Sequence, residues 1–198
     1  MTRLENDSCI VEIALDDTYE TDIDFNGKYD IVINPLGYSQ DEYHKAYAIH
    51  VFLKDKEYSV ALIGDYNCWD YNCGVIDGEV LTVLQGWEVT QFNITTAQVT
   101  RSVTLDIMAP NFEIHRVNTG YLIYGETDIT MLNNELETMW SFSGYDIFAS
   151  SSGKKSFEIK KDRICLYDFE DNYYELDFSR QSDLSHRCLI VEHSGGEG

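Results

Sequence analysis

Residues 120–178 read GYLIYGETDITMLNNELETMWSFSGYDIFAS followed by SSGKKSFEIKKDRICLYDFEDNYYELDF, and the two parts share one pattern. Asp128–Asn133 matches Arg163–Asp168 at an offset of 35 residues. After one inserted residue, two further apolar pairs align: Trp140 with Leu176 and Phe142 with Phe178. Apolar and polar residues alternate between turns of Asn, Asp, Glu and Gly, which is typical of strands with one buried face. The stretch therefore predicts an internal repeat of β-hairpins. We expect its core to contain Ile129, Trp140, Phe142, Ile164, Leu166 and Leu176.

The same alternation continues outward through most of the 198 residues. It predicts further strands at 8–15, 29–34, 45–54, 57–64, 79–85, 87–93, 99–108, 112–117 and 188–193, with a loop at 65–78. No window of ten or more residues has the pattern of an amphipathic helix. The sequence thus predicts an all-β protein of antiparallel strands, arranged as a sandwich, a barrel or an irregular propeller. We expect a single domain over residues 1–193 and a disordered tail over 194–198.

The charge of the chain restricts its partners. Thirty-five Asp and Glu against fourteen Lys and Arg give a net charge of −21, and the acids are spread along the whole sequence. Direct nucleic-acid binding is disfavoured because phosphate contacts need Lys and Arg. A basic protein partner is favoured instead, since opposite fields accelerate encounter. The alternative is that the acids only keep an aromatic-rich β-protein in solution.

The compartment is expected to be the cytoplasm. The first residues are polar and acidic, and no segment approaches the roughly 20 apolar residues of a membrane-spanning helix. The five cysteines are an odd number without the spacing of a disulfide framework. Reduced thiols and no membrane association are therefore predicted.

The sequence offers little for metal or catalytic chemistry. Asp22–Gly27 matches the first half of a calcium-binding EF-hand loop, but Ile33 occupies the position that requires Glu. Cys68 and Cys73 lack the second ligand pair of a structural zinc site. The five histidines form no zinc motif, and no nucleophile elbow, phosphate loop or dinucleotide fingerprint occurs. We expect no enzyme activity, no bound metal and no cofactor.

Two segments interleave acids with aromatic residues, and we predict that they bind the partner. The expected contact residues are Asp65, Tyr66, Trp69, Asp70 and Tyr71 in the first segment and Asp168, Glu170 and Asp171 in the second. Tyr and Trp are common interface anchors, and carboxylates beside them suit Lys and Arg of a partner. The alternative is that the aromatics point into the core while the acids cover turns.

Three short sequences carry a resemblance to known proteins. Tyr124-Gly125-Glu126, Trp140–Gly144 and Tyr167-Asp168-Phe169 resemble small bacterial all-β proteins, and the order strand, turn, strand, Trp-x-Phe resembles a blade of quinoprotein-like propellers. Some small acidic proteins of this kind are immunity proteins, which inhibit interbacterial toxins. The chain departs from true quinoprotein propellers in having too few blades and no cofactor motif.

Two functions follow as hypotheses. The first is an immunity-type inhibitor that occludes a basic bacterial toxin, with a nuclease as the expected class, by placing carboxylates where substrate phosphates would bind. The second is a small-ligand or carbohydrate-binding β-module with Trp69 and Trp87 as stacking platforms. A subunit of a larger assembly is a third possibility.

Overall fold

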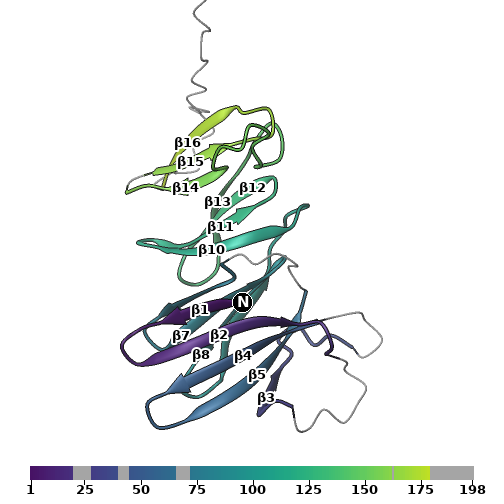
Figure 1. Ribbon diagram of the computed structural model, residues 1–198, viewed down its shortest axis with the longest axis vertical. Coiled ribbons are helices and arrows are strands. Elements are labelled where there is room, and N and C mark those ends of the chain that lie inside the picture. The colour runs from purple at the N-terminus through teal and green to yellow at the C-terminus, as the bar shows by residue number, and fades with distance from the viewer. Residues whose placement is uncertain (20–27, 40–44, 66–71, 162, 179–198) are drawn as a thin grey trace, which may run out of the picture.

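The computed structural model describes residues 1–19, 28–39, 45–65, 72–161 and 163–178 (Figure 1). Within these ranges the chain forms sixteen β-strands and no helix. The strands assemble into four open sheets, and all but one of the strand pairs are antiparallel. The all-β, antiparallel fold predicted from the alternating pattern is therefore confirmed.

The first sheet, sheet A, contains the N-terminal strands in the order β1-β2-β4-β5-β3. Its strands are β1 (Thr2–Glu5), β2 (Cys9–Asp16), β3 (Ile31–Ile33), β4 (Lys45–Leu53) and β5 (Glu57–Gly64). Strand β3 pairs with β5 in parallel, which gives the sheet its one exception to antiparallel pairing. The hairpin of β4 and β5 matches the sequence prediction closely.

The next three sheets are simple meanders, in which each strand pairs with its sequence neighbour. Sheet B contains β6 (Gly74–Asp77), β7 (Val80–Gln85), β8 (Glu88–Asn93) and β9 (Val99–Thr104). Sheet C contains β10 (Asn111–Val117), β11 (Gly120–Gly125), β12 (Asp128–Leu132) and β13 (Thr138–Ser143). Sheet D contains β14 (Phe157–Ile159), β15 (Arg163–Tyr167) and β16 (Tyr173–Asp177).

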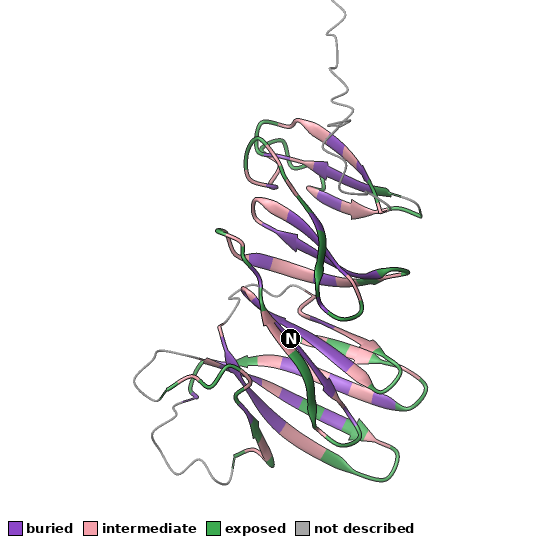
Figure 2. Ribbon diagram, turned by 180° about the vertical axis from the view of Figure 1, so that it is seen from behind, coloured by how far each residue is buried: buried purple, intermediate pink, exposed green. Residues whose placement is uncertain are grey.

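The four sheets are stacked in chain order, A to D, and an apolar layer separates each neighbouring pair (Figure 1). Ile49 of sheet A packs in one layer with Phe92 of sheet B, and Leu84 of sheet B packs in the next with Ile123 of sheet C. Trp140 of sheet C shares the third layer with Leu166 of sheet D. Buried residues accordingly run through the sheets along the whole stack (Figure 2).

The predicted repeat corresponds to two hairpins, β12–β13 and β15–β16. Five of the six expected core residues of this region are buried, and Phe142 is half-buried. The register nevertheless shifts the match by two residues, because Met131 pairs with Trp140 while its equivalent Leu166 pairs with Tyr174. One of the two residues comes from an irregularity after Met131, where the register of β12 and β13 shifts by one residue. The other comes from the inserted residue that the sequence match placed in the second hairpin. Trp140 is therefore equivalent to Tyr174, and both face the same layer.

Other differences from the sequence prediction concern short strands. β1 and β6 were not expected, and β6 lies in a segment predicted as loop. The predicted strand at 188–193 and the tail at 194–198 lie outside the described residues. No helix of the described ranges is both long and apolar enough to cross a membrane.

Candidate functional site

The first predicted segment begins at the end of β5, where Asp65 is half-buried. Its backbone N–H donates to the Glu88 carboxylate at 3.3 Å, and its carbonyl accepts from Nε2 of Gln85 at 3.3 Å. Asp65 is thus fixed against the turn between β7 and β8. The other four residues expected to bind a partner here lie outside the described ranges: Tyr66, Trp69, Asp70 and Tyr71.

A buried carboxyl group, Glu88, adjoins Asp65. Glu88 is 3% exposed, and burial raises the pKa of its carboxyl to about 7, although the Asp65 N–H opposes the rise. The neighbouring Gln85 amide donates to the Leu62 carbonyl at 3.1 Å, so the cluster links sheets A and B. No sequence signal distinguished Glu88 from the many other acids. At neutral pH this carboxyl is protonated in about half of the molecules, but its burial keeps it from a protein partner.

Three neighbouring strands of sheet A, β2, β4 and β5, have an end beside Asp65, since Asp16 pairs with Ala46 and Lys45 with Gly64. Burial would raise the pKa of Asp16, but hydrogen bonds from Lys28, Tyr29 and Thr18 outweigh it and lower the pKa to about 2. Its carboxylate accepts from Lys28 Nζ and from the Tyr29 hydroxyl, each at 2.6 Å. Asp16 therefore stabilises this end of the sheet, and Lys28 already neutralises its charge.

The second predicted segment forms the turn between β15 and β16. Asp168 is fully buried, so the expectation that it is an exposed turn acid is wrong. Its carboxylate accepts hydrogen bonds from the Asn172 N–H and amide, each at 2.9 Å, and from the Tyr174 hydroxyl at 2.5 Å. Asp168 consequently shapes the turn from within and does not itself face a partner.

The other two acids of this turn differ from each other. Glu170 is exposed. Asp171 is half-exposed, and hydrogen bonds from Ser152 and Ser150 lower the pKa of its carboxyl below the usual range. Lys154 lies 3.7 Å from the Asp171 carboxylate, so part of this charge is compensated. Glu170 is the predicted residue of this turn that is most open to a partner.

Two exposed aromatic residues that were not assigned from the sequence lie in this turn and in the segment that follows β13. Tyr145 is 85% exposed and Phe169 is 51% exposed, and the acids Asp146 and Glu170 beside them are exposed as well. The two segments are joined because the Phe169 N–H donates to the Ile147 carbonyl at 2.9 Å. We call Tyr145, Asp146, Phe169 and Glu170 the distal patch. Alternation along the strands gave no indication of it, because both segments are turns.

Of the first predicted segment, only Asp65 can be compared with the second. Asp65 directly follows β5 of sheet A and the distal patch lies in the region of sheet D, and these sheets lie at opposite ends of the stack (Figure 1). Asp65 and the distal patch therefore do not form one partner surface within the chain.

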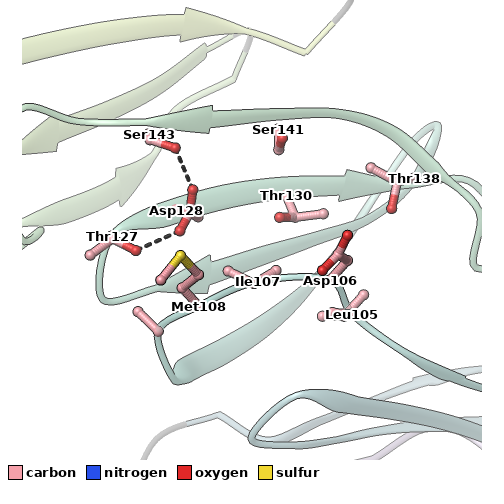
Figure 3. A pocket seen from close by; sticks show the side chains of 11 residues that line it. Leu105, Asp106, Ile107, Met108, Thr127, Asp128, Thr130, Thr138, Ser141 and Ser143 are labelled. Carbon is pink, nitrogen blue, oxygen red and sulfur yellow. Dashed lines mark hydrogen bonds between the residues drawn. The ribbon is translucent and has the colours of Figure 1, made fainter.

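A cleft of about 750 Å³ lies between sheet C and the segment 105–109, which connects β9 to β10. Figure 3 shows Asp128, Thr130, Ser141 and Ser143 on the sheet side. The opposite side holds Leu105, Asp106, Ile107 and Met108. The Asp128 carboxylate accepts hydrogen bonds from the hydroxyls of Thr127 and Ser143. None of these residues was singled out from the sequence, because the two walls are far apart along the chain.

A smaller cavity of about 490 Å³ contains the pair His115 and Glu113, whose Nε2 and carboxylate oxygen are 2.7 Å apart. Elsewhere in the described ranges, no group of three or more His, Cys, Asp or Glu is placed to hold a metal ion. The candidate calcium loop Asp22–Gly27 and Cys68 lie outside those ranges.

Comparison with known proteins assigns no relative. No family model matches the sequence, and no curated protein is detectably similar to it.

Proposed function

We propose that the protein is an acidic immunity-type inhibitor that binds and occludes a basic bacterial toxin, with a nuclease as the expected target class. The observation that carries the proposal is the distal patch, in which two joined segments each present an exposed aromatic residue followed by an exposed acid. Large aromatic side chains supply most of the energy of many interfaces, and acids around them select a basic partner. The net charge of −21 would steer such a partner toward the protein.

The distal patch is held in shape before any partner binds. The Tyr174 hydroxyl accepts from the Tyr145 N–H at 3.1 Å and donates to the buried Asp168 carboxylate. Asp168 in turn orders the loop that carries Phe169 and Glu170. A surface that is already ordered loses less conformational entropy on binding, which favours affinity. The buried Asp168 therefore supports partner binding by positioning, and Glu170 and Asp146 would meet the Lys and Arg residues of the toxin.

The test uses the purified protein and a basic nuclease toxin, which is to be sought as the product of a neighbouring gene. Nuclease inhibition and binding kinetics are measured for the native protein and for Phe169→Ala and Glu170→Gln. We expect Phe169→Ala to weaken binding by about tenfold or more, mainly through faster dissociation. Glu170→Gln should slow association and reduce its dependence on salt.

Asp55→Asn is a matched control, because Asp55 is an exposed acid in the β4–β5 turn at the other end of the stack. It should bind as the native protein does, apart from a small change in association rate. A toxin that is not inhibited, or one that binds all four proteins equally, would contradict the proposal.

The carbohydrate-binding alternative receives no support from the described residues of its expected platform. Trp87 is half-buried in the tight turn between β7 and β8, and Trp69 lies outside the described ranges.

A further inference from the structure

The cleft between sheet C and the segment 105–109 has features that packing does not explain. Along β12, Ile129 and Met131 face the layer between sheets C and D, whereas Thr130 and Leu132 face the other side. Leu132 is buried in the apolar layer between sheets B and C. Thr130 is only 2% exposed, yet its hydroxyl makes no hydrogen bond to another group of the protein. Valine has nearly the same shape and would fill this position equally well. The hydroxyl therefore suggests a hydrogen-bond partner that a ligand supplies.

The chemistry of the lining indicates what that partner is. The eleven lining residues include two carboxylates, Asp106 and Asp128, and no Lys, Arg or His. The remaining polar groups are hydroxyls, and those of Thr127 and Ser143 already donate to Asp128. Each lining hydroxyl can donate as well as accept, but the charged groups of the cleft, Asp106 and Asp128, only accept. Acceptors therefore predominate, an anion is disfavoured by charge, and a ligand with charged donors is favoured.

The apolar part of the lining adds a second requirement. Leu105, Ile107 and the fully exposed Met108 form the wall opposite the hydroxyls (Figure 3). Methylene groups would pack on this wall, while charged N–H donors would reach the carboxylates and Thr130 Oγ1. The cleft volume of about 750 Å³ is in the range of small-molecule sites.

We propose that this cleft binds a small organic cation in which amino groups alternate with methylene segments, that is, an aliphatic polyamine. Asp106 and Asp128 pair with ammonium groups, and Thr130 accepts a hydrogen bond from the ligand at the base of the cleft. The site is separate from the distal patch, and it does not depend on the proposed inhibition of a toxin.

The test is calorimetric titration of the full-length protein with spermidine, putrescine and glucose in 150 mM salt, a concentration at which diffuse surface attraction is largely screened (about 8 Å Debye length). We expect one spermidine per chain, weaker binding of putrescine and no binding of glucose. Asp106→Asn should weaken spermidine binding by about tenfold, because it removes a charge-assisted contact. Thr130→Val should weaken it by roughly three- to tenfold without any change of charge.

Asp55→Asn again provides the matched control, because it removes the same charge outside the cleft. It should leave spermidine affinity unchanged. The thermal midpoint of each variant, measured in parallel, shows that the fold is retained. Equal losses in Asp55→Asn and Asp106→Asn, or a Thr130→Val variant that binds as tightly as the native protein, would show only non-specific attraction to an acidic surface and overturn the proposal. Preferential binding of glucose would overturn the ligand class.

Discussion

Replacing Thr130 by valine should stabilise the free protein, although valine removes a polar group that most proteins would keep bonded. Thr130 is 2% exposed and its hydroxyl has no protein partner. A buried polar group in this state costs about 1–3 kcal/mol. The added methyl group contributes about 0.8 kcal/mol of hydrophobic burial, and valine is well suited to a strand. Allowing for imperfect fit of the new methyl, we expect a net gain of about 1–2 kcal/mol in the free energy of unfolding.

The assay is urea unfolding followed by tryptophan fluorescence, supported by the thermal midpoint. For a chain of this size each kcal/mol raises the midpoint by about 2–4 °C. Thr90→Val is the matched control, because Thr90 is equally buried on β8 but its hydroxyl lies 2.8 Å from the Ser102 hydroxyl. It should destabilise the protein by about 1 kcal/mol. If Thr130→Val lowers stability as Thr90→Val does, the Thr130 hydroxyl contributes to folding and the reasoning for the cleft fails.

Three other substitutions probe the fold. Because the pKa of Glu88 is raised to about 7, the folded state binds this proton more tightly than the unfolded state, and the free energy of unfolding falls as the pH rises from about 4.5 to 7. Glu88→Gln should remove up to roughly 3 kcal/mol of this fall. The variant should therefore show a smaller difference between the free energies of unfolding at pH 5 and pH 8. Trp140→Ala should cost about 3–5 kcal/mol in urea unfolding, and little change would mean that the faces of β13 are inverted. Gly120 has a φ of 152°, and a Cβ there would meet the backbone of the facing strand, whereas at Gly78 φ is 60° and the space is open. Gly120→Ala should therefore lower the free energy of unfolding far more than Gly78→Ala. Similar losses of stability in the two variants would contradict this.

The strands predicted most accurately were those joined by short turns. In the hairpin of β4 and β5, burial alternates along β4 from Tyr47 to Phe52, but β5 is buried throughout residues 60–64 and was located by the charged turn before it. Strands β7 and β8 of an inner sheet were also located to within one residue, at 79–85 and 87–93, but their pattern does not show a single buried face. Val80–Gln85 is buried on both faces because sheet B has a neighbour on each side, so polar residues such as Thr82 are as buried as Leu81 and alternation weakens.

The candidate sites were less accessible to sequence reasoning. Asp168 was expected at the surface because it lies in an acidic turn, but its local hydrogen bonds to Asn172 and Tyr174 draw it inside. The match between the two hairpins of the repeat was displaced in part by a one-residue irregularity between β12 and β13, and no single residue indicates this irregularity. The cleft depends on the segment 105–109 folding back against β12 and β13, which is a long-range contact without a local signature.

The open stack also determines how the molecule should lose structure. Sheets B and C are supported on two sides, whereas sheet D, among the residues that the structure describes, packs on sheet C alone through one apolar layer. On the outer side of sheet D, the Tyr173 hydroxyl donates to the Glu175 carboxylate, which also forms an ion pair with Arg163. These polar side chains cover the last sheet as the polar outer face of a terminal repeat does in a solenoid. Stability in such a linear array is a sum of neighbour terms, so opening begins at an end and spreads inward. Backbone amides of β14–β16 would then exchange with solvent before those of β7 and β8, and the protein could detach its last sheet while the rest remains folded.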